Sequence, residues 1–396
     1  MVIAALSILG ILAILWDAFE AIVLPRRVTR RFRLTKLWFR ATWSPWRAVT
    51  RRIRANKRRE RSLSYYGPLS LLFLFMAWAA GLIFCFAVLQ WALGSGFNAP
   101  EGHVKFTTDL YMSATTFFTL GLGDVTPVTR AARIVTAAQG GTGFGFLALV
   151  ISYLPVIYQA FSRRETNISL LDARAGSPST AFELLRRHGL AHRLGDLPQY
   201  LHDWEHWAAD LMESHLSYPV LGYYRSQHDN QSWLSALTVI LDTCTLAIGG
   251  VDGLDKWQAE LTFAMARHVV VDLAQVFSAA PRPPNPDRLT HQDMVKLRER
   301  LAEAGVVLHD GQAVDDKVAK LRSMYEPYAN ALSQFLLMPL PAWAPTAKAL
   351  SNWQVTAWEA VAAADGALPG EEDQVPGSAH HGAGRRKKKE THETKA

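Results

Sequence analysis

Cysteine is nearly absent from this sequence, because only Cys85 and Cys244 occur among 396 residues. Two cysteines so far apart give no disulfide framework, and the part outside the hydrophobic runs is therefore expected in a reducing, cytoplasmic compartment. A glycine-rich dinucleotide loop after a strand is also missing, which argues against a Rossmann module that senses nucleotides. Few segments in the second half of the sequence show the alternation of apolar and polar residues that is typical of β-strands. These absences favour a helical domain there.

Acidic residues are scarce between Arg26 and Arg61, where Glu60 is the only one. With a net charge of +7, such a basic segment could indicate nucleic-acid binding. It lies, however, between two hydrophobic runs and has three tryptophans interleaved, which is typical of a segment that lies on a bilayer. We therefore expect anionic lipid headgroups as its partner, and no nucleic acid.

Three hydrophobic runs are long enough to cross a membrane: Val2–Leu24, Pro68–Leu93 and Arg130–Ala160. A cleaved signal peptide does not fit the first run, because its positive charge follows the apolar residues instead of preceding them. Basic residues follow the first and third runs, and the positive-inside rule places those ends in the cytoplasm. The prediction is a multi-pass protein of the cell membrane, with its N-terminus outside and its C-terminal half in the cytoplasm.

Asp17 and Glu20 lie three residues apart near the basic end of the first run, on one helical face. Two interpretations stay open. The carboxylates could be solvated among the headgroups, or they could pair with the following arginines or with a neighbouring helix, since acidic groups deeper in lipid tend to face protein.

A short helix is predicted over Asp109–Phe118, between the second and third runs. The next six residues alternate glycine with larger side chains and end in an acid: Thr119-Leu120-Gly121-Leu122-Gly123-Asp124. Non-helical backbone at membrane depth is tolerated only where it lines an aqueous path or is buried in protein. Glycine accepts the backbone angles that let successive carbonyls point to one side, and rings of carbonyls can replace the hydration shell of a cation.

This arrangement resembles the pore loop of potassium channels, in which a Thr-Val-Gly-Tyr-Gly-Asp filter follows a pore helix between an outer and an inner helix. The resemblance covers residues 68–164. It implies that the backbone of Thr119, Leu120, Gly121, Leu122 and Gly123 binds K⁺ as the permeant ion, with the Thr119 hydroxyl, and that Asp124 lies at the outer mouth. It also implies a pore helix whose carbonyl end favours a cation in the central cavity.

Two positions of the loop depart from the potassium-channel pattern. Leu122 replaces the usual tyrosine, and Phe118 stands where a second threonine is frequent. Tyr111 and Met112 occupy positions where the family often has paired tryptophans. A weakly selective cation channel therefore remains an alternative to a potassium-selective one. In either case a homotetramer is expected, because one filter strand per chain cannot enclose an ion.

The third run contains residues that could bend it: Gly140, Gly141, Gly143, Gly145 and Pro155. They are candidates for a gating hinge. Close helix packing in the membrane, where small residues are common, explains the glycines equally well.

The second half is predicted to be a helical cytoplasmic domain that modulates opening, broken into two parts at Pro281–Pro286. His202 and His206 share a helical face and could bind a metal ion, although Trp204 and Trp207 also fit an ordinary amphipathic helix. A membrane-anchored helical metalloenzyme is thus a further alternative. The expected helices are Ala181–His188, Leu201–His215, Trp233–Ala247, Lys256–Ala279 and His291–Ala304.

The sequence as a whole predicts an all-α membrane protein that is a channel and no enzyme, with no catalytic residue and no cofactor. The gating stimulus is not indicated. The predicted divisions are an N-terminal membrane helix (1–24), a basic interfacial segment (25–67), a pore domain (68–164), a helical domain (165–353) and a disordered basic tail (354–396).

Overall fold

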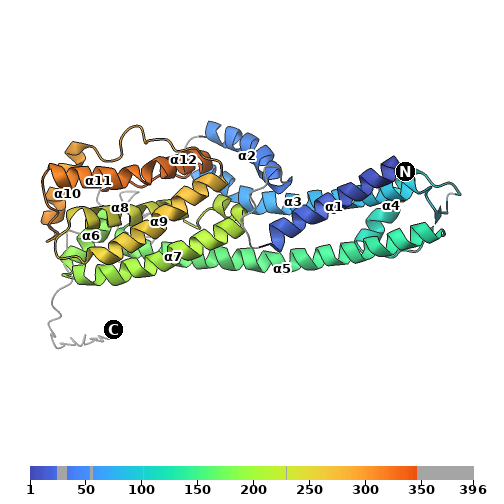
Figure 1. The fold of residues 1–396 in the computed structure, drawn as a ribbon, viewed down its shortest axis with the longest axis horizontal. Coiled ribbons are helices and arrows are strands. Elements are labelled where there is room, and N and C mark those ends of the chain that lie inside the picture. The colour runs from blue at the N-terminus through green and yellow to red at the C-terminus, as the bar shows by residue number, and fades with distance from the viewer. Residues whose placement is uncertain (25–33, 54–56, 101, 229, 346–396) are drawn as a thin grey trace, which may run out of the picture. The chain divides into compact units, whose positions relative to one another are not determined.

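A computed structural model describes residues 1–24, 34–53, 57–100, 102–228 and 230–345 (Figure 1). The predicted tail at 354–396 lies outside these residues. Within them the fold is all-α, as predicted, and its only strands form one two-residue antiparallel pair. The elements are α1 (Val2–Ile22), α2 (Leu34–Arg52), α3 (Lys57–Ala92), β1 (Phe97–Asn98), α4 (Phe106–Phe117), β2 (Thr126–Pro127), α5 (Arg130–Ala175), α6 (Ala181–Leu190), η1 (Leu194–Asp196), α7 (Leu197–Ser217), η2 (Pro219–Tyr223), α8 (Trp233–Gly250), α9 (Lys256–Val276), α10 (His291–Ala302), α11 (Gln312–Ser323) and α12 (Glu326–Leu336).

Four of the described helices are long and apolar enough to span a membrane: α1, α3, α5 and α8. The apolar stretches of the first three are only 28%, 44% and 22% buried within the protein, whereas that of α8 is 94% buried. The apolar character of α8 is therefore explained by its position in a protein core. The three remaining helices correspond to the three hydrophobic runs of the sequence.

Asp17 connects α1 to two neighbouring helices. Its carboxylate is buried and accepts hydrogen bonds from the Thr35 hydroxyl of α2 (2.7 Å) and from Trp78 Nε1 of α3 (3.1 Å). Glu20 accepts a hydrogen bond from Trp16 Nε1 within α1 (2.7 Å). For Asp17, the interpretation that it pairs with a neighbouring helix is therefore correct, because a buried carboxylate requires such donors.

The basic helix α2 packs against protein through its tryptophan face. Trp43 is only 3% exposed, its ring lies 4.7 Å from that of Tyr66, and its Nε1 donates to the carbonyl oxygen of Phe335 (3.2 Å). The helix thus lies between α3 and the C-terminal helical domain. Arg47 also contacts this domain, because its Nη2 donates to the carbonyl oxygen of Gln334 (3.0 Å).

Helix α5 runs for 46 residues without a break and is therefore about 70 Å long by the rise of an α-helix. It passes through Pro155 and through residues 164 and 165, where the sequence suggests the end of the pore domain. Helix α3 likewise passes through residues 67 and 68. The same helices therefore belong to the pore and to the segments beside it (Figure 1).

The C-terminal helical domain has one core built around α8. Helices α7 and α9 pack on each other, α9 packs on α8, and α10 to α12 pack back onto α6, α8 and α9. The break at Pro281–Pro286 therefore does not separate a second lobe. The expected helices are present with ends shifted by a few residues, and α11 and α12 were not predicted.

Candidate functional site: the pore loop

Helix α4 is fixed on both sides by buried side-chain hydrogen bonds. The Ser113 hydroxyl donates to the carbonyl oxygen of Ile83 in α3 (2.6 Å), and Gln139 Nε2 of α5 donates to the Ser113 carbonyl oxygen (2.9 Å). At the start of the helix, the Ser95 hydroxyl donates to the buried carboxylate of Asp109 (2.8 Å). These contacts hold α4 between α3 and α5. They were not predicted, because nothing local in the sequence pairs Gln139 with Ser113.

The predicted filter residues, 119–123, follow the end of α4 through a tight turn and are called the filter strand below. The Thr119 amide donates to the carbonyl oxygen of Thr116 (3.0 Å), and the Leu120 amide donates to that of Thr115 (2.8 Å). From there φ is positive at alternate residues, namely Thr119 (55°), Gly121 (59°) and Gly123 (80°). A positive φ at a β-branched residue such as Thr119 is strained and is concentrated at functional sites.

The alternating sign of φ turns successive peptide groups toward the same side of the strand, whereas an ordinary β-strand alternates them. All of residues 119–124 are exposed in the single chain. A row of unpaired carbonyls that faces one way is the chemical group that can replace the water around a cation. The structure therefore brings the predicted filter residues into one continuous strand.

The far end of the filter is held by Tyr111 and by the strand pair. The Tyr111 hydroxyl donates to the carboxylate of Asp124 (2.8 Å), which joins α4 to the residue that directly follows the predicted filter. Beyond Asp124, strands β1 and β2 pair Phe97 with Pro127 and Asn98 with Thr126. This pairing joins the beginning and the end of the segment between α3 and α5. The sequence places Tyr111 where potassium channels often have a tryptophan, but it does not predict the contact with Asp124.

The glycines of α5 have different surroundings. A Cβ added at Gly143 would lie 2.1 Å from the carbonyl oxygen of Phe117, while at Gly140 it would lie 3.8 Å from Thr116 Cγ2. At Gly141 and Gly145 it would meet nothing within 4 Å. Gly143 therefore serves close packing between α5 and the end of α4. Its hinge function, like that of the other glycines and Pro155, stays a hypothesis.

Beyond the pore, α5 is fastened to the helical domain by Arg164, whose side chain is buried. The guanidinium pairs with Glu165 (2.8 Å) and donates to the carbonyl oxygens of Leu221 (3.0 Å) and Tyr224 (3.1 Å). Its Nη1 also lies 3.2 Å from His215 Nε2. These contacts join α5 to η2 and to the segment after it through one buried network, called the junction below.

His215 makes the stability of this junction depend on pH. Burial, and next the charge of Arg164, hold the pKa of His215 well below its usual value of 6.5. The folded protein therefore keeps His215 neutral, whereas the unfolded chain takes up a proton as the pH falls below about 6.5. We expect this residue to lower the free energy of unfolding by about 1.4 kcal/mol per pH unit below that value.

The measurement is the thermal unfolding of the solubilised protein between pH 7.5 and 5, at values chosen to bracket an ordinary histidine pKa of roughly 6.5. His215→Gln should make the decline shallower. His291→Gln, at a histidine whose side chain is 79% exposed, should leave the decline unchanged. Equal declines in the wild type and His215→Gln would show that the junction does not titrate through this residue.

The predicted metal ligands His202 and His206 do lie together, with their Nε2 atoms 3.2 Å apart. Glu205 has its Oε2 atom 3.9 Å from His202 Nδ1 and accepts a hydrogen bond from Gln258 Nε2 (2.7 Å). In the part of the chain that the structure describes, no three histidine, cysteine or acidic residues form a group that could hold a metal ion. The metal hypothesis lacks a third ligand there.

Comparison with known protein families gives one match, between residues 71–159 and the model of a family described as "Ion channel". The matched part contains α4, the filter strand and most of α3 and α5. The comparisons with curated proteins and with solved structures give no match. Residues 71–159 thus match an ion-channel family of the pore-loop class, and this match, together with the long apolar helices, supports a membrane protein and a passive ion channel.

Proposed function

We propose that this chain, in which residues 71–159 form an ion-channel domain, is one subunit of a homotetrameric potassium-selective channel. The observation that carries the proposal is the filter strand, where positive φ at Thr119, Gly121 and Gly123 gives a row of carbonyls on one side. Potassium passes by exchanging its hydration shell for such carbonyls at several successive sites.

The exposure of this strand in the single chain supports a tetramer. Leu120 and Leu122 are 59% and 62% exposed in the single chain, and the polar backbone between them is also open. Unpaired backbone at membrane depth must face protein or an aqueous path. Four strands around one axis meet both needs, because the carbonyls face the ions while the side chains face the neighbouring subunits.

The network behind the filter supports selectivity in the absence of the usual tyrosine. Tyr111 holds Asp124, and Gln139 holds Ser113, so the loop is tied to α4 and α4 to α5. A weakly selective cation channel is the second candidate. It is favoured by Leu122, which has no hydroxyl with which to brace the filter.

The proposed topology places the N-terminus outside and the helical domain in the cytoplasm. It is supported by the basic residues of α2 and of the α5 junction, which follow α1 and the apolar part of α5. Because α5 continues into the helical domain and is anchored there by Arg164, movements of that domain would act on the pore through one continuous helix.

The test is reconstitution of the full chain in a planar bilayer with potassium on one side and sodium on the other. A reversal potential near the potassium equilibrium potential supports the proposal, whereas a reversal near zero identifies the weakly selective channel.

Gly121→Ala should remove the current, because φ is +59° there. Gly102→Ala is the matched control, since Gly102 also has a positive φ (70°) and open space but lies outside the filter. Loss of current in both variants would contradict the proposal. The absence of any current from the intact wild-type tetramer would contradict it too.

A further inference from the structure

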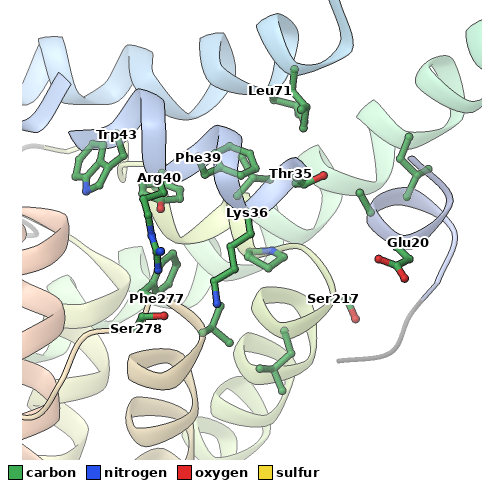
Figure 2. A pocket seen from close by; sticks show the side chains of 18 of the residues that line it. Glu20, Thr35, Lys36, Phe39, Arg40, Trp43, Leu71, Ser217, Phe277 and Ser278 are labelled. Carbon is green, nitrogen blue, oxygen red and sulfur yellow. The ribbon is translucent and has the colours of Figure 1, made fainter. Parts of the chain in front are cut away.

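A cavity of about 440 Å³ lies where α1, α2 and α3 meet η2 and the end of α9 (Figure 2). One wall is apolar and consists of Leu71, Leu74 and Phe75 of α3, which also belong to the core of the membrane helices. The lining also includes cationic side chains of α2. The volume is within the range of about 300–1,000 Å³ typical of small-molecule sites.

Lys36 and Arg40 lie one helical turn apart on α2, and Figure 2 shows both side chains extending into this region, toward Ser278 at the end of α9. Both residues are exposed. Neither forms an ion pair or a side-chain hydrogen bond with any other residue that the structure describes. They are therefore available to an anion.

The surroundings add further positive charge. Arg47, which also lines the cavity, donates to the carbonyl oxygen of Gln334 (3.0 Å), and no carboxylate pairs with it among the described residues. Burial, and next the charges of Arg51 and Arg282, lower the pKa of Arg47. Of the acids nearby, Glu20 lines the cavity and Asp17 is held by Thr35 and Trp78. Cations outnumber acids in the lining by three to one, since it contains Lys36, Arg40 and Arg47 against Glu20.

We propose that this cavity binds one anionic phospholipid, with its phosphate at Lys36 and Arg40 and one acyl chain along Leu71, Leu74 and Phe75. The amphipathic lining favours an anionic amphiphile, because a free anion would leave the apolar wall uncovered and the quaternary ammonium of a zwitterionic lipid would bring further positive charge close to both cations. The cavity is too small for a whole phospholipid, so the second acyl chain stays in the bilayer. The proposal requires only that the chain lies in a membrane and does not depend on potassium selectivity.

The site lies next to the junction that fastens α5. Its lining includes Tyr153 of α5 and Val220 of η2, and the next residue, Leu221, accepts a hydrogen bond from Arg164. A lipid bound here would contact α2, α3, α5 and η2 together. It would thus stabilise one arrangement of the pore relative to the helical domain.

The test is binding of short-chain phosphatidylglycerol to the purified full-length protein, measured by native mass spectrometry and by the upward shift of the melting temperature. Lys36→Gln combined with Arg40→Gln should weaken binding by about tenfold or more, as expected for the loss of charge-assisted hydrogen bonds. Arg51→Gln combined with Arg52→Gln is the matched control, because it removes the same charge from the last turn of the same helix, outside the cavity lining.

Three outcomes would overturn the proposal. Equal weakening in the two double variants would indicate general surface electrostatics. Equal binding of phosphatidylcholine would show that the cations do not select an anion. Complete competition by millimolar inorganic phosphate would identify a free phosphate as the occupant. Retained tight binding in the control, with loss in the cavity variant and no competition by phosphate, supports a phospholipid.

Discussion

Replacing Gly143 by alanine is expected to abolish conduction. The new Cβ would lie 2.1 Å from the carbonyl oxygen of Phe117 and 2.9 Å from its carbonyl carbon. Both are backbone atoms of a fully buried residue at the end of α4, two positions before the filter begins, so no flexible side chain can yield. Relief requires α4 and α5 to separate. Overpacking of this kind costs about 1–3 kcal/mol, and the accompanying shift would be passed directly to Thr119.

The matched control is Gly140→Ala, on the same helix and beside the same end of α4. Its Cβ would meet Thr116 Cγ2 at 3.8 Å, an ordinary van der Waals distance, so conduction should persist. Potassium flux into liposomes, together with the oligomeric state of each variant, separates loss of conduction from loss of assembly. Wild-type flux in Gly143→Ala would instead show that α5 yields at this position, as the hinge hypothesis requires.

The pore loop was predictable because its signal is local. The order of short helix, alternating glycines and acid is contained within Asp109–Asp124, and the structure gives α4 followed by alternating positive φ in this place. The contacts that support the loop are not local. Gln139 reaches Ser113 across 26 positions and Asp17 reaches Trp78 across 61, and no periodicity pairs such side chains.

Helix breakers carry less information than the pore-loop pattern. Pro155 lies inside α5, which continues past it for 20 residues to Ala175, so the proline does not end the helix, and its function as a hinge stays a prediction. The prolines of 281–286 do interrupt the chain, but they do not divide the domain, since α12 packs on both α8 and α9. A local cluster of prolines indicates where a helix ends. It does not indicate which part of the protein the following segment packs against.

The second large effect is expected at Arg288 in the helical domain, which neutralises two buried acids. Its Nη2 donates to Asp242 (2.6 Å) and its Nη1 to Glu326 (2.8 Å), whose side chains are 0% and 5% exposed. Arg288→Met should lower the free energy of unfolding by about 3–5 kcal/mol, because it leaves Asp242 buried without a cation, while Glu326 keeps only its ion pair with Arg322 (3.0 Å). The exposed pair of Arg193 and Asp196 gives the control, and Arg193→Met should change stability by less than about 1 kcal/mol.

The pH dependence distinguishes a buried charge from a simple loss of packing. Burial raises the pKa of Asp242 to about 6 even with Arg288 beside it, so removing the cation raises this pKa further. A carboxyl whose pKa is higher in the folded than in the unfolded state destabilises the fold as the pH rises from the unfolded pKa toward the folded one. In the wild type, this loss of stability is complete once the pH exceeds the Asp242 pKa of about 6. In Arg288→Met the stability keeps falling above that pH, because the Asp242 pKa is higher. The difference in melting temperature between the two proteins should therefore widen above about pH 6.

Arg288→Met combined with Asp242→Asn should remove most of this widening, because the amide cannot ionise. A difference that is constant with pH would mean that Arg288 contributes through packing against Trp343, whose ring centre lies 5.6 Å from its guanidinium, and not through its charge.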